Sequence, residues 1–268
     1  MTRRRIPIAL TIAGSDSGGG AGAQADLKTF AALRVHGTCA ITCLTAQNPR
    51  GVRGVQAAAP AMLRAQLEAV FAELPPAACK TGMLCSEPLL RVVVEFFRQG
   101  GRPPLVVDPV LMATSGARLL SAAAMRLLQR ALLPLATLVT PNLDEVRTLL
   151  GRPVTSVAEM RRAGLELAAQ FGTNFLIKGG HLRETIATDL LCEAGGAVHE
   201  FSAPFVPGVS THGTGCTYAA AITAGLGKGL ALREAVGEAK EFLTRAVANF
   251  LSWERPGGRT DALHHFAK

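Results

Sequence analysis

Residues 8–22 read Ile8-Ala9-Leu10-Thr11-Ile12-Ala13-Gly14-Ser15-Asp16-Ser17-Gly18-Gly19-Gly20-Ala21-Gly22, an apolar run of strand length that passes directly into a glycine-rich loop. The next segment, 23–33, is typical of a helix. A strand, a loop and a helix make the first part of a parallel crossover unit. Arg3, Arg4 and Arg5 precede the apolar run as in a signal peptide, but Pro7 interrupts it and no cleavage site follows. We therefore predict a buried first strand.

The same alternation of short apolar runs and longer helical segments continues along the chain. The strand-like runs are 40–44, 105–107, 138–140 and 174–178, and the helical segments are 61–74, 122–133, 143–150 and 158–171. Residues 188–192 and 198–203 flank Gly195-Gly196 and predict an antiparallel hairpin near the sheet edge, and 214–226 and 232–253 predict two closing helices. The pattern predicts an α/β fold with three α/β/α layers and a mostly parallel central sheet, in one domain over residues 1–268.

Composition narrows the class of protein. The 268 residues are 49% hydrophobic, which is enough for a sizeable core, and no segment is long enough to span a membrane. The six cysteines show no Cys-x-x-Cys spacing, so we expect reduced thiols in the cytoplasm and no zinc site. The net charge of +8 comes from scattered basic residues with one Trp and one Tyr, a distribution that favours anionic small molecules over nucleic acid.

The segment His212-Gly213-Thr214-Gly215-Cys216 precedes a helical segment of small residues. Glycines allow neighbouring N–H groups to converge, and the first turn of a helix has unpaired donors, so this loop suits a phosphate or an oxyanion. A thiol held there is expected to ionise more easily than usual. An ordinary turn into a helix that carries a buried cysteine is an equally good interpretation of the segment alone.

Other polar loops also follow predicted strands. They are 14–22, Gln47-Asn48, Asp108-Pro109 and Lys178-Gly179-Gly180-His181, which should meet at the carboxyl edge of the sheet, where ligands bind. The first loop matches neither the P-loop nor the dinucleotide fingerprint. Lys178 is a candidate for binding a phosphate chain, with a surface lysine as the alternative.

Asn142, Asp144 and Glu145 come directly after a predicted strand and Thr140-Pro141. Amide and carboxylate oxygens at a helix start can hold a hydrated magnesium ion. The same residues also fit a helix cap, with Asn142 as the N-cap and Glu145 completing a capping box. Asp108, at a strand end, has the same two interpretations.

The polar segments together resemble the bacterial hydroxymethylpyrimidine/phosphomethylpyrimidine kinases of thiamine biosynthesis. The matching segments keep their order and are 13–22, Gln24-Ala25-Asp26-Leu27-Lys28-Thr29, Thr45-Ala46-Gln47-Asn48, Val107-Asp108-Pro109-Val110, 178–181, 212–217 and the ending His264-His265-Phe266. Two segments depart from the family pattern, Leu111-Met112 and Ala117. The departures affect the local nucleotide contacts that the resemblance implies, and not the class of enzyme.

The resemblance implies a ribokinase-like fold, ATP and Mg2+, a homodimer, and two successive phosphoryl transfers to 4-amino-5-hydroxymethyl-2-methylpyrimidine. It implies that Gly213, Thr214, Gly215 and Cys216 form the anion hole, with Cys216 at a position where many ribokinase-like enzymes carry an aspartate base. Lys178 would complete the catalytic set.

The same resemblance assigns the remaining site residues. Substrate contacts would fall on Asp26, Gln47, Gly14 and Met83, although Asp26 has Lys28 as an alternative partner and Met83 is also a typical core residue. Lys178, Thr214 and Asn142 would bind the nucleotide, and Asp108 and Glu145 the metal.

Three other functions fit parts of the pattern. A pyridoxine or pyridoxal kinase of the same superfamily would phosphorylate a similar hydroxymethyl group on a pyridine ring. A non-catalytic pyrimidine-binding regulator would keep the fold without needing Lys178 or Glu145. A redox sensor based on Cys216 would need a second cysteine close in space.

Overall fold

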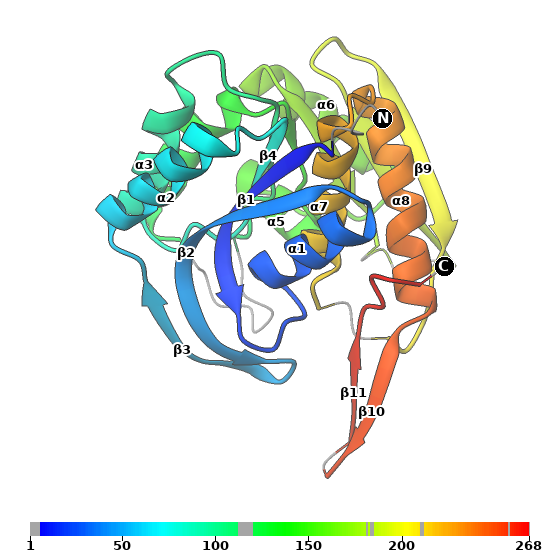
Figure 1. Ribbon diagram of the computed structural model, residues 1–268. Helices are drawn as coiled ribbons and strands as arrows, with labels where there is room; N and C mark the ends of the chain where they lie inside the picture. Colours follow the sequence, from blue (N-terminus) through cyan, green and yellow to red (C-terminus); the bar gives the residue numbers. More distant parts are fainter. Residues whose placement is uncertain are drawn as a thin grey trace, which may run out of the picture.

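In the computed structural model, which describes residues 6–111, 120–180, 182, 185–209, 212–256 and 258–267, a nine-stranded sheet forms the centre of the molecule (Figure 1). Its strands are β1 (Ile8–Asp16), β2 (His36–Asn48), β3 (Gly51–Ala57), β4 (Ala78–Thr81), β5 (Leu105–Val107), β6 (Leu138–Val139), β7 (Asn174–Lys178), β8 (Ile186–Cys192) and β9 (Val198–Pro204). They lie in the order β3-β2-β1-β4-β5-β6-β7-β8-β9. From β2 to β7 all neighbours are parallel, whereas β3, β8 and β9 pair antiparallel at the two edges. The predicted mostly parallel sheet and its edge hairpin are confirmed.

Helices cover both faces of the sheet. One face packs against α2 (Pro60–Glu73), α3 (Glu87–Phe97), α4 (Ala122–Leu127), α5 (Leu143–Leu150) and α6 (Val157–Phe171), and the other against α1 (Gly22–Ala32), α7 (Thr214–Gly227) and α8 (Leu232–Ala248). Each face has its own apolar core, because strands buried on both sides need a hydrophobic layer on each. The structure is therefore the expected three-layer α/β/α arrangement.

Two segments differ from the sequence-based expectation. Of the helix predicted over 122–133, only the part up to Leu127 is α-helical. A π-helical turn, Leu128–Leu132, and a 3-10 turn, Leu133–Leu135, follow it. The helix predicted to reach Trp253 ends at Ala248, so that prediction was wrong. The chain forms instead a hairpin of β10 (Leu251–Arg255) and β11 (Gly258–Ala262), because Pro256 and Gly258 favour a turn over a helix.

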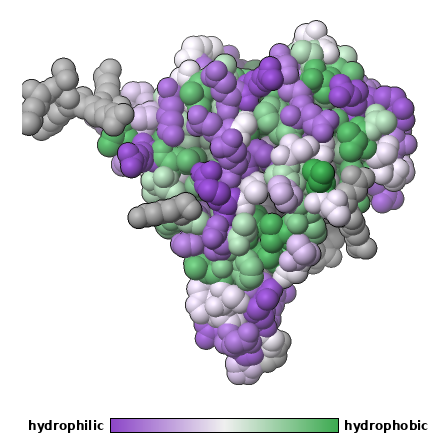
Figure 2. All heavy atoms as spheres, turned by 90° about the vertical axis from the view of Figure 1, so that its right-hand side faces the viewer, coloured by the Kyte–Doolittle hydropathy of each residue, from purple (hydrophilic) through white to green (hydrophobic). Residues whose placement is uncertain are grey.

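The hairpin projects from the body of the molecule and carries mostly hydrophilic side chains (Figures 1 and 2). Polar and apolar side chains are interspersed on the rest of the face in Figure 2. Within the described residues, no helix combines the length and the apolar character needed to cross a bilayer.

Candidate active site

The loop after β1 is organised by one buried carboxylate. Asp16 is 3% exposed and accepts hydrogen bonds from the backbone N–H groups of Gly18, Gly20 and Ala21 at 2.8, 3.1 and 2.8 Å. Burial by itself would raise the pKa of Asp16, but hydrogen bonds from His212 and from the backbone outweigh it and hold this pKa below its ordinary value. The glycine-rich loop is thus wrapped around an ionised side chain.

The loop before α7 lies directly against the glycine-rich loop. Gly213 is the N-cap of α7 with a φ of +84°, and a Cβ added to it would lie 1.8 Å from the carbonyl oxygen of Gly20. Only glycine fits this contact, since an L side chain would meet both backbone strain and a backbone atom. We call residues 212–216 the anion loop, because they lead into the first turn of α7.

The thiol of Cys216 is not activated in the way the sequence suggests. Cys216 is half-buried in the first turn of α7. Burial raises the pKa of the Cys216 thiol to about 12, and the nearby charge of Lys80 offsets this only in part. The expectation of an easily ionised thiol is therefore wrong for the protein without ligands, and the group is a neutral S–H at pH 7.

Asp26 lies in a buried ion pair. Its Oδ2 accepts from Lys80 Nζ at 2.8 Å and from the hydroxyl of Thr11 at 2.6 Å, and both side chains of the pair are fully buried. Burial raises the pKa of Asp26, and Lys80 and Thr11 oppose this increase. Burial alone would lower the pKa of Lys80, but Asp26, together with Cys216 and Asp108, outweighs this effect and raises the pKa above its ordinary value. Lys28, the alternative partner of Asp26, instead donates to the carbonyl of Gly19.

A second ion pair lies at the carboxyl ends of β5 and β7. Lys178 Nζ is 3.1 Å from Asp108 Oδ1, which also accepts from the hydroxyl of Thr140 at 3.3 Å. Desolvation would lower the pKa of Lys178, whereas the carboxylates of Asp108 and Glu145 raise it above its ordinary value. A Cβ built on Gly215 would lie 3.3 Å from Lys178 Nζ and 3.6 Å from Asp108 Oδ2. The pair therefore faces the anion loop.

Asn142 and Glu145 form the capping box of α5. The Asn142 side chain accepts from the Glu145 N–H at 2.9 Å, and Glu145 Oε2 accepts from the Asn142 N–H at 2.8 Å. The other oxygen of Glu145 accepts from the N–H of Leu111 at 3.2 Å. Burial raises the pKa of Glu145, and the neighbouring Asp108 charge adds to this increase while Lys178 opposes it. The structural interpretation of these residues is confirmed, and Glu145 also lies close to Asp108 and Lys178.

Gly14, in the loop after β1, lies side by side with Met83. A Cβ on Gly14 would be 2.9 Å from Met83 Cε and 2.8 Å from Cys43 Sγ, so a side chain there would have to displace these two side chains. Gln47, which lies within β2 rather than after it, has its Nε2 3.3 Å from His212 Nε2. The anion loop therefore contacts Gln47 through His212 at one end and approaches Lys178 through Gly215 at the other.

Three residues of this arrangement were not singled out from sequence. Asp16 and His212 stood inside the quoted motifs but had no assigned role, and Lys80 follows no motif. The C-terminal segment also reaches the site, because His265 Nε2 is 3.0 Å from the hydroxyl of Thr217, next to Cys216. The departing residues Met112 and Ala117, and His181 of the fourth loop, lie outside the described residues.

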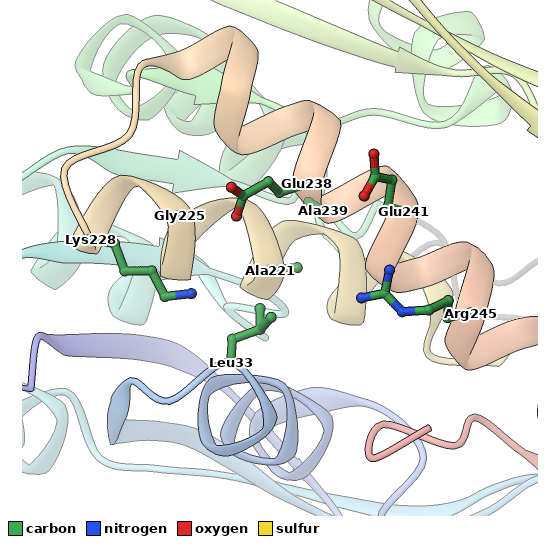
Figure 3. A pocket seen from close by; sticks show the side chains of 8 residues that line it. All are labelled: Leu33, Ala221, Gly225, Lys228, Glu238, Ala239, Glu241 and Arg245. Carbon is green, nitrogen blue, oxygen red and sulfur yellow. The ribbon is translucent and has the colours of Figure 1, made fainter. Parts of the chain in front are cut away.

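A separate hollow of about 260 Å3 lies between the end of α1, the later part of α7 and α8 (Figure 3). Leu33, Ala221, Gly225 and Ala239 give it apolar walls, and Lys228, Glu238, Glu241 and Arg245 give it charged ones. None of the predicted site residues lines it.

Comparison with known proteins gives a consistent result. Residues 16–261 match the family model described as Phosphomethylpyrimidine kinase. The chain is 45% identical over 260 residues to the hydroxymethylpyrimidine/phosphomethylpyrimidine kinase of Rhizobium meliloti, with 97% of each chain covered. It is 44% identical over 248 residues to the thiamine biosynthesis bifunctional protein ThiED of Geobacter sulfurreducens, where 91% of this chain spans 50% of that protein.

A solved structure of a related kinase has the same fold. The ADP complex of Bacillus subtilis pyridoxal kinase has a TM-score of 0.89 to this chain at 34% identity, with 98% of each chain covered.

Proposed function

Because this chain belongs to the phosphomethylpyrimidine kinase family, we propose that it phosphorylates 4-amino-5-hydroxymethyl-2-methylpyrimidine with ATP, first on the hydroxymethyl oxygen and then on the resulting monophosphate. The product of the two transfers is the diphosphate used in thiamine biosynthesis. The 45% identity to a kinase of this name over nearly the whole chain favours it over a pyridoxal kinase, for which the solved relative is 34% identical.

The observation that carries the proposal is the position of the anion loop between two sets of residues. One end holds His212 against Gln47, and the other end brings Gly215 close to Lys178 and Asp108. An acceptor bound between Gln47 and Met83 would have its hydroxymethyl group near the N–H groups of α7. Phosphoryl transfer depends mainly on positioning and on neutralising charge, which this arrangement supplies.

We propose that the substrate oxygen that receives the phosphoryl group lies next to Cys216. A thiol with a pKa of about 12 is a poor base at pH 7, so Cys216 orients the substrate hydroxyl by a hydrogen bond rather than removing its proton in advance. A loose transition state for phosphoryl transfer needs little prior deprotonation. Gly213, Thr214 and Gly215 would provide backbone N–H groups to the transferred group, and Lys80 lies close enough to lower the pKa of Cys216 in part.

Lys178, Thr214 and Asn142 are assigned to the nucleotide. Lys178 would bind the phosphate chain once its contact with Asp108 is shared with the ligand. Among the described residues no cluster of three or more acidic, histidine or cysteine side chains is built to hold a metal ion. Mg2+ binds through one or two carboxylates, water and substrate phosphates.

Asp108 and Glu145 supply the carboxylates for such an ion, and Asp108 Oδ2 faces the anion loop. When bound, Mg2+ would neutralise charge on the phosphate chain of ATP. Glu145 already accepts two backbone hydrogen bonds, so it would act on the ion through water.

Assembly and location complete the proposal. We place the enzyme in the cytoplasm, in agreement with six free thiols at Cys39, Cys43, Cys79, Cys85, Cys192 and Cys216. We also propose a homodimer, because the family resemblance implies one. Light scattering on the purified chain would give one or two copies, and a monomer at micromolar concentration would remove the dimer from the proposal.

The first experiment measures phosphoryl transfer from MgATP to the hydroxymethylpyrimidine, to its monophosphate and to pyridoxal, with products resolved by mass. Formation of both the monophosphate and the diphosphate is expected. Turnover of pyridoxal alone would contradict the proposal, and pyrimidine binding without turnover would favour a regulator.

Two lysine variants distinguish a specific role of Lys178 in turnover from a general effect of losing one positive charge. Lys178→Met should abolish turnover, whereas Lys228→Met, an exposed lysine at the hollow of Figure 3, should leave it unchanged. Cys216→Ser with undiminished turnover would exclude a base role for the thiol, and Cys216→Ala should be slower than Cys216→Ser because it removes the hydrogen bond.

A further inference from the structure

One ring nitrogen of His212 lies between two polar side chains from distant parts of the chain. His212 Nε2 is 3.2 Å from Asp16 Oδ2 and 3.3 Å from Gln47 Nε2. Asp16 is 3% exposed and already accepts three backbone N–H bonds, so its carboxylate is fixed. A carboxylate can only accept hydrogen bonds, and His212 must therefore carry a hydrogen on Nε2.

This hydrogen determines the orientation of the Gln47 carboxamide. A protonated Nε2 has no lone pair left for the amino group of Gln47, so the carbonyl oxygen of Gln47 must face His212 instead, and the one N–H is shared between Asp16 Oδ2 at 3.2 Å and the Gln47 carboxamide end at 3.3 Å. The two ends of a carboxamide have nearly the same shape, and exchanging them changes no packing.

Thr45 supports the same orientation from the other side. Its hydroxyl is 2.8 Å from the carbonyl oxygen of Ser15 and 3.3 Å from Gln47 Oε1, the position that the amino group takes once the two ends are exchanged. The single hydroxyl hydrogen goes to the closer carbonyl, so Thr45 presents lone pairs to Gln47 and accepts from its amino group. With the carbonyl toward His212 and the amino group toward Thr45, every donor in this set meets an acceptor.

We propose that His212 is a specificity-determining positioning residue, which locks the Gln47 carboxamide so that it accepts on the His212 side and donates on the Thr45 side. This inference rests on the proposed function, in which Gln47 faces the pyrimidine. A 4-aminopyrimidine has a donor amino group beside an acceptor ring nitrogen and matches the locked carboxamide by two hydrogen bonds, as glutamine matches adenine. A 4-oxopyrimidine has an acceptor oxygen beside a donor ring N–H and would need the opposite orientation.

The locked carboxamide rejects the wrong ring because turning it would mismatch both His212 and Thr45. Sites built around particular donors and acceptors discriminate strongly against analogues that leave these groups unpaired. Without the hydrogen on His212 Nε2 the carboxamide can turn, and each ring then finds a matching orientation. Loss of His212 should therefore reduce selectivity more than it reduces turnover of either ring.

The test compares 4-amino-5-hydroxymethyl-2-methylpyrimidine with its 4-oxo analogue, because both carry the hydroxymethyl group that is phosphorylated. The readout is the ratio of their kcat/KM values with MgATP, together with the ratio of their dissociation constants by calorimetry. We expect the wild-type ratio to favour the amino compound by about 100-fold or more and to fall at least about tenfold in His212→Leu.

Three further variants control the test. His212→Gln keeps an N–H donor near the position of Nε2 and should retain the wild-type ratio. Asp16→Asn no longer requires a hydrogen on Nε2 and should lower the ratio. His199→Leu removes a half-buried histidine 3.0 Å from Glu193 at the far edge of the sheet and should leave the ratio unchanged.

The outcomes separate this inference from the proposed function. An unchanged ratio in His212→Leu, or an equal loss in His212→Gln, would overturn the role of His212 even if both compounds are phosphorylated. If the wild type phosphorylates neither compound, the proposed function fails, and the ratio of dissociation constants then decides the role of His212 alone. If neither compound binds, both are overturned.

Discussion

Replacing Gly213 with alanine should push apart the two loops that form the candidate site. A Cβ on Gly213 would lie 1.8 Å from the carbonyl oxygen of Gly20, whereas ordinary contact begins at 3.4 Å. The anion loop must therefore shift by about 1.6 Å relative to the glycine-rich loop, since neither backbone has a flexible end that can give way. Its left-handed backbone adds a penalty of about 1–2 kcal/mol.

The shift should cost activity more than stability. A misplacement of about 1 Å in a reacting geometry can cost about 100-fold in rate, so we expect Gly213→Ala to lower kcat/KM by at least this factor. Gly151, which ends α5 with a φ of +72° and open space around a built Cβ, is the matched control. Gly151→Ala has the same backbone penalty without the clash and should keep its turnover.

The assay is steady-state phosphorylation of the hydroxymethylpyrimidine, with urea unfolding measured on the same samples. Both variants should lose about 1–2 kcal/mol in the free energy of unfolding from the backbone term alone. A Gly213→Ala enzyme whose kcat/KM lies within about threefold of that of Gly151→Ala would refute the claim that loop contact fixes the reacting geometry.

Three other perturbations follow from buried titratable groups. Lys240→Met removes the ammonium 2.6 Å from Asp189 and leaves a buried carboxylate unpaired, so the free energy of unfolding should drop by about 3–5 kcal/mol in urea, and a drop below about 1 kcal/mol would contradict this. Burial lowers the pKa of His265 from 6.5 to about 4, so the unfolded chain takes up the proton first, and the stability present above pH 6.5 is lost as the pH falls toward 4. His265→Gln should flatten that part of the stability curve, and parallel curves for the two proteins would count against it. Burial raises the pKa of Cys216 to about 12, so its alkylation by iodoacetamide, followed by peptide mass, should quicken about tenfold per pH unit from about pH 7 to 10, and a plateau would reveal a thiolate.

The parallel part of the sheet was predictable because strands buried on both faces appear in the sequence as short apolar runs. Residues 105–107 and 174–178 were predicted with the bounds that β5 and β7 have. Strand β3 gives no such signal, since all seven of its residues are exposed at the sheet edge. Strand β4 includes the buried Lys80, which interrupts the apolar pattern.

The sequence indicated which loops form the site, but not which side chains pair with each other inside it. The ends of the predicted strands indicate which loops meet. They do not indicate the ion pairs, because Asp26 pairs with Lys80 across 54 residues and Asp16 with His212 across 196. Such pairs depend on strand register and on how far α7 approaches the first loop, neither of which is encoded locally. The prediction that Cys216 ionises easily was wrong for the same reason. The helix N-terminus, which would lower the pKa of the thiol, is visible in the sequence, but the burial that raises this pKa is not.

A neutral thiol at residue 216 suits a site whose two acceptors differ in charge. The first acceptor is an uncharged alcohol, whereas the second is a phosphate that is ionised at pH 7 and needs no base. A carboxylate at this position would repel that phosphate, with an interaction on the order of 4 kcal/mol for unit charges at about 4 Å and an effective dielectric constant of about 20. Cys216→Asp should therefore lower kcat/KM for the monophosphate by about two to three orders of magnitude more than kcat/KM for the alcohol. Because the alcohol reaction of the same variant reports on folding and on ATP binding, an equal loss in both reactions would contradict the electrostatic argument.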